Sequence, residues 1–360
     1  MNTNFTNGLI VMATNETSNH LESVGFDLDF TIIKPLGKRK FSKTPKDWEF
    51  MSPKVTTIMR ELVKTKNVVI FSNQLGLKND VKKQEFIEKI KLVQSDLDIP
   101  FILYASILDD SFRKPRTGMF TKYKTDNPSI KFLYYIGDAA GRENDFSASD
   151  IKFAFNLNVL FYTPEVFFKD IFNPQNDRKI QADLAKICNP KDVLITEDNT
   201  PIKSDYSVIV FTGFPGSGKS TFYGKHFKDS HVHINQDKLK TNEKCIKEIK
   251  ESLSKSRKVV VDKTNPDINS RKIYIDIAKQ FNVSVCSYNF ITEKDTCLHN
   301  NYFRSETTNI KPVPKIAYNI YESKFTSPET SEGFEEVMDV PFHVDLGTKE
   351  LQDSYQKYFI

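Results

Sequence analysis

The feature that most constrains the fold is an alternation of apolar runs with amphipathic stretches along the chain. The apolar runs are typical of buried strands, and each ends in a polar or glycine-bearing turn: residues 68–73, 132–138, 208–213, 258–264 and 283–290. Three stretches have the pattern of helices: residues 82–97, 265–281 and 292–306. This alternation predicts an α/β protein with mostly parallel strands.

The length of the chain points to two domains. At 360 residues it is too long for one core of ordinary size. Residues 188–207 are polar and contain two prolines, which favours a boundary there. The expected organisation is a flexible polar tail (1–20), a first domain (21–187), a linker (188–205), a second domain (206–350) and a C-terminal tail (351–360).

Composition excludes several classes of protein. With 39% hydrophobic and 27% charged residues, the chain is globular rather than disordered. No apolar run approaches the ~18 residues of a membrane span, and the N-terminus lacks the basic region of a signal peptide, so we expect an intracellular protein with no membrane partner. Four cysteines without a CxxC pair argue against a disulfide framework or a zinc site. The net charge of +4 permits polyanionic partners without proving any.

Two aspartates stand at the end of an apolar strand in GFDLDFT, where Asp27 and Asp29 are followed by Thr31. A strand of period two points both carboxylates to the same side, where their repulsion raises the pKa of one of them. Folding alone gives no reason for this arrangement. An isolated pair of this kind could still be a solvated strand end, because aspartate satisfies backbone donors there.

Polar side chains also end other strands of the N-terminal half. Ser72 and Asn73 follow VVIF, Lys114 lies in RKPRTG, and Asp138 lies in IGDAAG. Because the carboxyl ends of parallel strands meet at one crevice, these groups can meet the two aspartates there. Carboxylates with a lysine and a hydroxyl make a site for Mg²⁺ and a phosphate. Asp145 and Asp150 are weaker candidates. Each could cap a helix as readily as it could support the metal ligands without binding the metal itself.

The motif Asp27-Leu28-Asp29-Phe30-Thr31 resembles the DxDxT signature of the haloacid-dehalogenase-type phosphatases. The resemblance implies that Asp27 is the nucleophile, which forms an aspartyl-phosphate, and that Asp29 is the general acid and base. Phe30 departs from the glycine that many members have at its position.

The same resemblance implies the remaining roles in this site. Ser72, Asn73 and Lys114 match the phosphate-binding positions. Asp138 matches the magnesium carboxylate, joined by Asp27 and the backbone carbonyl of Asp29.

The C-terminal half carries the motif GxxxxGK[ST] directly after the strand VIVFT. Glycines let backbone N–H groups approach phosphates, the lysine reaches the β- and γ-phosphates, and the serine hydroxyl binds Mg²⁺. A plain glycine-rich turn is the alternative, but the strand before and the helical pattern after the motif favour ATP binding. The motif residues are Gly213, Phe214, Pro215, Gly216, Ser217, Gly218, Lys219, Ser220 and Thr221.

Three later residues are candidates for the transfer step. Asp237 follows a short strand and suits a base near the acceptor hydroxyl, although it could instead cap a helix beginning at Lys238. Asp262 ends a longer strand and suits a metal ligand. Arg304, in HNNYFR, could close over the phosphates, or it could be a solvated helix residue.

The two halves together resemble the bifunctional polynucleotide 5′-kinase/3′-phosphatases of animals and other eukaryotes. The segments that carry this resemblance are GFDLDFT, VVIFSNQ, RKPRTGMF, IGDAAGR, GFPGSGKSTF, KTNPDINSR, HNNYFR and EGFEEVMDVPF. It implies removal of 3′-phosphates and phosphorylation of 5′-hydroxyls at DNA ends, with Mg²⁺ and ATP as cofactors, in a monomer located in the nucleus. Four alternatives stay open. The substrate could be RNA ends, the location could be the cytoplasm, and the protein could instead be a kinase/phosphatase of small metabolites or a repair scaffold without catalysis.

Three departures limit the resemblance. The residues before the first motif are too few for the forkhead-associated domain of many animal members, so recruitment through that domain is not expected. Lys263 stands where asparagine is commoner, and Gln236 stands where some members have arginine. Both could change the grip on the strand.

Overall fold

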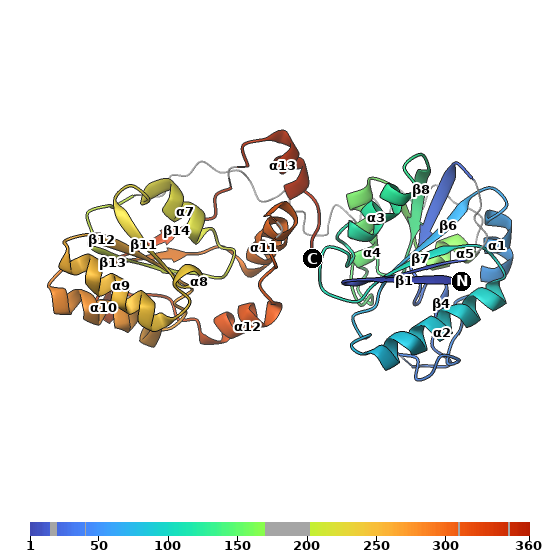
Figure 1. Ribbon diagram of the computed structural model, residues 1–360, viewed down its shortest axis with the longest axis horizontal. Helices are drawn as coiled ribbons and strands as arrows, with labels where there is room; N and C mark the ends of the chain where they lie inside the picture. The colour runs from blue at the N-terminus through green and yellow to red at the C-terminus, as the bar shows by residue number, and fades with distance from the viewer. Residues whose placement is uncertain (15–19, 40, 170–201, 309, 345) are drawn as a thin grey trace. The chain divides into compact units, whose positions relative to one another are not determined.

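The computed structural model describes residues 1–14, 20–39, 41–169, 202–308, 310–344 and 346–360. The chain forms two compact units (Figure 1). The first comprises Met1–Asn189 and Gln356–Ile360, and the second comprises Pro190–Tyr355. Of the expected linker, residues 188–201 lie outside the described part of the chain.

The first unit is built on a seven-stranded sheet in the order β1-β2-β7-β6-β3-β8-β9. The strands from β7 to β9 are parallel, while β2 pairs antiparallel with both β1 and β7. Their bounds are β1 Asn2–Thr6, β2 Leu9–Ala13, β3 Glu22–Phe26, β6 Asn67–Asn73, β7 Ile102–Ser106, β8 Lys131–Ile136 and β9 Leu160–Tyr162.

Helices cover both faces of this sheet (Figure 1). Successive residues of β6 face opposite cores: Ile70 packs with residues of α1, α2 and α5, and Phe71 packs with residues of α3 and α4. This period of two is what a strand buried on both faces requires. The remaining elements are α1 Val55–Leu62, α2 Asp80–Leu97, α3 Gly118–Asp126, α4 Ser149–Leu157, α5 Pro164–Lys169, and the short pair β4 Ile33–Lys34 and β5 Glu49–Phe50.

The second unit has a five-stranded parallel sheet in the order β11-β12-β10-β13-β14. Helix α7 packs on one face of it, and α9 and α10 pack on the other. The strands are β10 Val208–Thr212, β11 His231–Asn235, β12 Lys258–Asp262, β13 Val285–Phe290 and β14 Glu336–Val340. The helices are α7 Lys219–His226, α8 Gln236–Leu239, α9 Asn242–Ser254, α10 Ile268–Phe281, α11 Lys294–Thr308, α12 Lys315–Lys324, η2 Thr330–Glu332 and α13 Lys349–Tyr355. The expected α/β class is confirmed.

Both expected tails were wrong. Within residues 1–20, β1 and β2 form a hairpin whose second strand completes the sheet, and Leu9, Ile10 and Met12 are buried. Residues 351–360 hold most of α13 and then a segment, Gln356–Ile360, that belongs to the first unit. In each case buried side chains anchor a stretch that the sequence led us to expect as a tail.

Four hydrogen bonds, made by three side chains, anchor residues 356–360 within the first unit. The side-chain amide of Asn156 donates to the carbonyl of Tyr358 at 2.7 Å and accepts from its N–H at 2.7 Å. The guanidinium of Arg116 donates to the carbonyl of Phe359 at 3.1 Å, and the Lys152 amine donates to the carbonyl of Ile360 at 2.9 Å. The first unit is therefore assembled from two separate parts of the chain.

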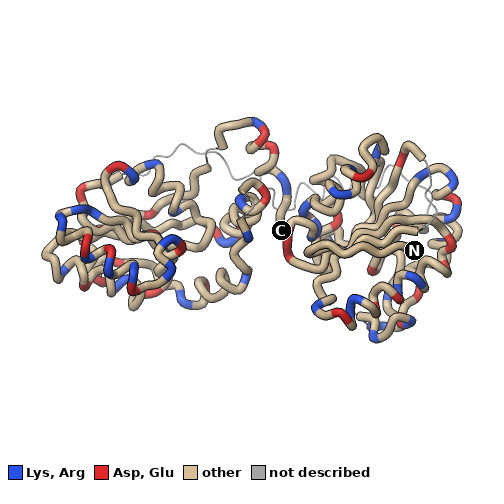
Figure 2. Tube along the Cα trace, in the orientation of Figure 1, with Lys and Arg blue, Asp and Glu red and all other residues tan. Residues whose placement is uncertain are grey.

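Charges of both signs are interspersed along the outer helices, as Figure 2 shows. On α2, Lys82 pairs with Glu85 at 2.7 Å and Lys83 pairs with Asp80 at 3.0 Å. Exposed pairs of this kind contribute little to stability. Among the described residues, no helix is both long enough and apolar enough to traverse a bilayer.

Candidate active sites

The carboxyl ends of four adjacent strands bring the predicted residues of the first unit together. Asp27 follows β3, Ser72 and Asn73 end β6, and Asp138 follows β8. Lys114 comes from the loop after β7. The strand order β7-β6-β3-β8 makes these ends neighbours, as expected for a parallel sheet.

Lys114 lies at the centre of this group. Its amine donates to Asp27 Oδ1 at 2.6 Å, to Asp150 Oδ1 at 2.7 Å and to the Tyr135 hydroxyl at 2.7 Å. Lys114 is only 3% exposed. Burial alone would lower its pKa, but the Asp150 and Asp27 carboxylates raise the pKa above its ordinary value, so the amine keeps its charge.

The carboxylates outnumber the positive charges at this edge. Asp27, Asp138 and Asp150 each offer an oxygen within 4.8 Å of the others. Burial raises the pKa of Asp27 well above its usual range, and burial with the Asp150 charge raises the pKa of Asp138 to about 7. Two carboxyl groups with raised pKa values, close to a third carboxylate, fit a hard divalent cation, whose charge would offset their repulsion.

Asp150 is a site residue that the sequence left undecided. It is 1% exposed, and besides Lys114 it accepts from the Ala139 N–H at 3.1 Å. Asp145 has another role, because its Oδ2 accepts from the N–H groups of Ala140 and Arg142 at 3.0 Å each and so closes the loop after β8.

Two further residues hold Asp29. The Gln74 amide donates to Asp29 Oδ2 at 2.6 Å and to the Ser72 hydroxyl at 2.9 Å. The Lys89 amine, from α2, lies 3.2 Å from Asp29 Oδ1. Asp29 is therefore fixed from two directions.

Asn73 and Phe30 are each explained by local backbone geometry. The Asn73 amide donates to the Lys114 carbonyl at 3.1 Å and accepts from the Lys114 N–H at 2.9 Å, which positions the loop that carries this lysine. Phe30 has φ +59°, in the left-handed region that favours glycine. The turn after β3 thus accounts for the glycine that the resemblance led us to expect there.

Sequence patterns did not identify Gln74, Lys89 or Tyr135 as members of this site, and they left Asp150 undecided. Gln74 directly follows the predicted Ser72-Asn73 pair, so its position was a usable signal. Lys89 and Asp150 lie on helices, and Tyr135 lies within an apolar strand, where a polar tip is hidden among core residues.

In the second unit, the loop after β10 has the backbone that its glycines allow. Gly216 and Gly218 have φ +77° and +96°. A Cβ at Gly216 would lie 2.4 Å from the Cys297 carbonyl oxygen. Only glycine fits both the conformation and the close approach of α11.

Lys219 is buried beneath this loop. Its amine donates to the Gly213 carbonyl at 2.9 Å and to the Ser217 hydroxyl at 3.1 Å. Burial lowers the pKa of Lys219 to about 8. The phosphates of a nucleotide would stabilise its charged form.

Asp262 gathers three donors at the end of β12. The Ser220 hydroxyl donates to Asp262 Oδ2 at 2.6 Å, the Asn235 amide donates to it at 3.0 Å, and His233 Nε2 lies 2.9 Å from it. Burial alone would raise the pKa of Asp262, but these contacts hold it below the usual range. A carboxylate beside the loop serine fits a magnesium site. His233 and Asn235 alternate on β11, a signal that had been missed.

The structure places Asp237 in α8 and Arg304 in α11. Asn235, rather than Asp237, caps α8: its side chain accepts from the N–H groups of Asp237 and Lys238. Within the described residues no hydrogen bond occupies the Asp237 carboxylate. Arg304 is exposed on α11, one turn after Asn300, whose amide donates to the Gly216 carbonyl at 2.9 Å. Residues four apart on a helix share a face.

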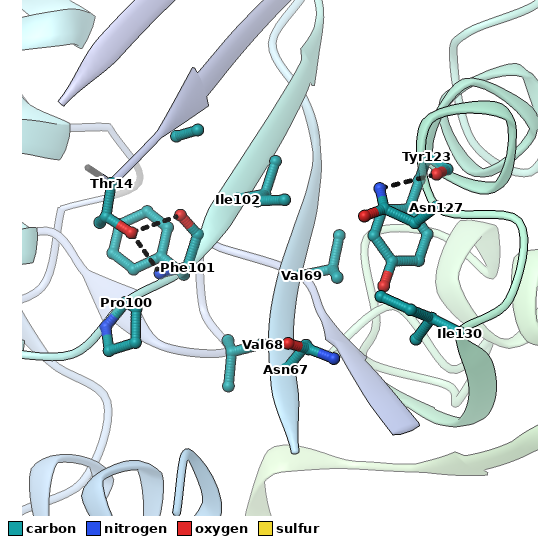
Figure 3. Close-up of a pocket in the computed structure, with 11 residues that line it drawn as sticks. Thr14, Asn67, Val68, Val69, Pro100, Phe101, Ile102, Tyr123, Asn127 and Ile130 are labelled. Atoms are coloured by element: carbon teal, nitrogen blue, oxygen red, sulfur yellow. Dashed lines mark hydrogen bonds between the residues drawn. The ribbon is translucent and has the colours of Figure 1, made fainter. Parts of the chain in front are cut away.

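A small cavity of about 80 Å³ lies elsewhere in the first unit (Figure 3). It is bounded by Asn67 and Ile102, at the amino ends of β6 and β7, opposite the edge that holds Asp27. Two of its polar side chains are paired locally: Thr14 bonds the backbone of Phe101, and Asn127 donates to the Tyr123 carbonyl at 3.0 Å. This volume suits a few waters, and the cavity is separate from the candidate site.

Comparisons with known proteins show what each unit is similar to. The family model "Polynucleotide kinase 3 phosphatase" matches residues 22–168, and the model "AAA domain" matches residues 208–328. A bifunctional polynucleotide phosphatase/kinase of Schizosaccharomyces pombe is 39% identical over 348 residues, which cover 93% of this chain and 83% of the relative.

Two other relatives match different shares of this chain. A putative bifunctional polynucleotide phosphatase/kinase of Acanthamoeba polyphaga mimivirus is 32% identical over 89% of this chain and 84% of its own length. A polynucleotide 3′-phosphatase of Saccharomyces mikatae is 33% identical over 41% of this chain and 85% of its own length.

Proposed function

Since the chain belongs to the family of the bifunctional polynucleotide phosphatase/kinases, we propose that it removes 3′-phosphates and phosphorylates 5′-hydroxyls at DNA strand breaks, leaving ends that a ligase can join. The observation that supports the proposal is that one chain carries, on separate units, the buried Lys114–Asp27 pair and a glycine-rich loop whose Ser220 bonds Asp262. Hereafter the first unit is called the phosphatase unit and the second the kinase unit.

In the phosphatase unit, Asp27 attacks the phosphorus of the 3′-phosphate. Asp29 protonates the leaving 3′-oxygen and then takes a proton from the water that hydrolyses the aspartyl-phosphate. The buried Lys114 and the Ser72 hydroxyl bind phosphoryl oxygens, and Asn73 positions Lys114.

The same edge suits a magnesium ion. Asp27, Asp138 and the backbone carbonyl of Asp29 would hold it, with Asp150 as a further carboxylate. Bound there, Mg²⁺ would offset the charge of the phosphoryl oxygens.

In the kinase unit, the loop Gly213–Thr221 binds the phosphates of ATP, and Lys219 contacts the β- and γ-phosphates. Ser220 and Asp262 would hold the magnesium ion that accompanies ATP. Asp237 accepts the proton of the 5′-hydroxyl as that oxygen attacks the γ-phosphorus. Arg304 stabilises the charge that develops on the transferred group.

A nick that bears a 3′-phosphate and a 5′-hydroxyl tests both activities in one tube. Asp27→Asn should lower 3′-phosphatase activity roughly 10³-fold or more, because an amide is a poor nucleophile, and should leave the kinase intact. Lys219→Ala should lower 5′-phosphorylation roughly 10²-fold or more and leave the phosphatase intact. With ligase and ATP, the mixture of the two variants should yield sealed product and neither variant alone should.

If either single change removed both activities from a folded protein, the two-site proposal would be rejected. We further propose that DNA is preferred to RNA, and that the protein acts as a monomer in the nucleus. An assay with an RNA version of the nick tests the preference for DNA. Gel filtration tests the monomeric state. If the RNA substrate were turned over as fast as the DNA substrate or faster, the proposed preference for DNA would be wrong.

A further inference from the structure

Helix α11 and Thr292, two residues before it, hold two consecutive carbonyl groups of the phosphate-binding loop. The Asn300 amide donates to the Gly216 carbonyl at 2.9 Å, and the Thr292 hydroxyl donates to the Ser217 carbonyl at 3.1 Å. A peptide group is planar, with its C=O and N–H pointing in opposite directions. Holding these carbonyls therefore fixes the directions of the Ser217 and Gly218 N–H groups.

Asn300 is itself held by Tyr355, at the end of α13. The Tyr355 hydroxyl and Asn300 Oδ1 lie 2.6 Å apart. The Gly216 carbonyl can only accept, so Asn300 must present its NH₂ to the loop and its oxygen to Tyr355, which makes Tyr355 the donor. If the hydroxyl were absent, the amide would lose the partner that sets its orientation.

Packing fixes the tyrosine ring independently of this bond. Tyr355 is 4% exposed, and its ring meets His299 and Phe303 edge-on, with centroids 4.5 and 5.0 Å away. Removing the hydroxyl alone would thus leave the ring seated. The matched "AAA domain" region ends at residue 328, before α13.

We propose that Tyr355 and Asn300 are positioning residues for the kinase reaction, which set the phosphate-binding loop in the conformation that receives ATP. Neither side chain needs to touch the nucleotide for this role. The inference rests on the proposed ATP-dependent kinase activity.

The test is Tyr355→Phe in the full chain, which keeps the ring and deletes the hydroxyl. We expect the KM for ATP, and the Kd for a non-hydrolysable ATP analogue with Mg²⁺, to rise roughly 3- to 10-fold, the size of one lost hydrogen bond. The 3′-phosphatase rate should stay at the wild-type value, which also reports that the chain is folded. Tyr206→Phe is the matched control, because it deletes a hydroxyl bonded to Glu336 at 3.1 Å at the other end of β10, and it should leave ATP affinity unchanged.

A double-mutant cycle decides whether Tyr355 acts through Asn300. Asn300→Ala should weaken ATP binding at least as much as Tyr355→Phe, and adding Tyr355→Phe to Asn300→Ala should have no further effect. Wild-type ATP affinity in Tyr355→Phe, or additive effects in the double variant, would overturn the inference. A wild-type protein that binds the analogue but phosphorylates no DNA end would instead count against the proposed kinase function, since the binding measurement needs no polynucleotide.

Discussion

At the scale of single residues, the protonation of the His299 ring affects the stability of the kinase unit. The ring is 6% exposed, and burial lowers its pKa from 6.5 to about 4. The unfolded chain therefore binds a proton between these pH values that the folded chain does not. Stability from this residue is fully present above about pH 6.5 and is lost as the pH falls through 4.

The expected loss on acidification is on the order of 3 kcal/mol, from a pKa difference of about 2.5 units. Urea unfolding of the kinase unit, followed by loss of ATP-analogue binding, should show it between pH 6.5 and 4. His299→Gln should flatten this part of the profile, whereas His226→Gln, on α7, should not. Parallel profiles for wild type and His299→Gln would contradict the assignment.

The sequence predicted most of the site residues that end strands or lie in the loops after them. It left Asp150 undecided and missed Lys89 and Tyr135, which reach the site from a helix and from within a strand. Asp27, Ser72 and Asp138 could be placed together because parallel strands share one carboxyl edge. Asp150 and Lys89 reach the same edge from helices, and where a helix docks depends on packing that no local pattern encodes. Tyr135 has the apolar neighbours of any core residue, so only the fold reveals its bond to Lys114.

At the scale of elements, the hairpin of β1 and β2 shows how a structural strand can look like a tail. Asn7-Gly8 is a strong hairpin signal, and Gly8 has the positive φ, +88°, that such a turn needs. Strand β1, however, is mostly exposed and polar, so its side chains lack the buried alternation that marks a strand. The pairing of β1 with β2 therefore depends on backbone hydrogen bonds rather than on side chains.

The hairpin yields a paired prediction, because Phe5 and Ile10 are partners in its register. Ile10 is fully buried and Phe5 is 52% exposed. Ile10→Ala should destabilise the phosphatase unit by about 2–4 kcal/mol, while Phe5→Ala should cost less than about 1 kcal/mol. The measurement is the urea concentration at which 3′-phosphatase activity is lost. A flexible tail would instead give equal, negligible effects for both variants.

At the scale of the whole molecule, residues 356–360 support the loop that carries Lys114. Asn156 bonds both Tyr358 and the Pro115 carbonyl, and Arg116 bonds both Phe359 and the Asp110 carbonyl. Pro115 and Arg116, which these bonds hold, directly follow Lys114 in the sequence.

Deleting residues 357–360 should therefore lower the phosphatase kcat roughly 10-fold, because a loosened loop misplaces Lys114. Lys357→Ala, at an exposed position, is the control and should behave as wild type. Oligonucleotide assays of both activities would measure the effect. An unchanged phosphatase rate in the deletion variant would mean that the segment only covers the surface.

The split origin of the phosphatase unit has a consequence for synthesis and inheritance. A ribosome finishes residues 1–189 long before it makes Gln356–Ile360, so the nascent phosphatase unit must wait for the entire kinase unit before its last contacts can form. A nonsense or frameshift allele anywhere in the kinase reading frame would likewise leave every phosphatase motif encoded, yet remove the segment that braces Lys114. Such alleles should behave as defects in both activities, although their lesions lie in only one half of the gene.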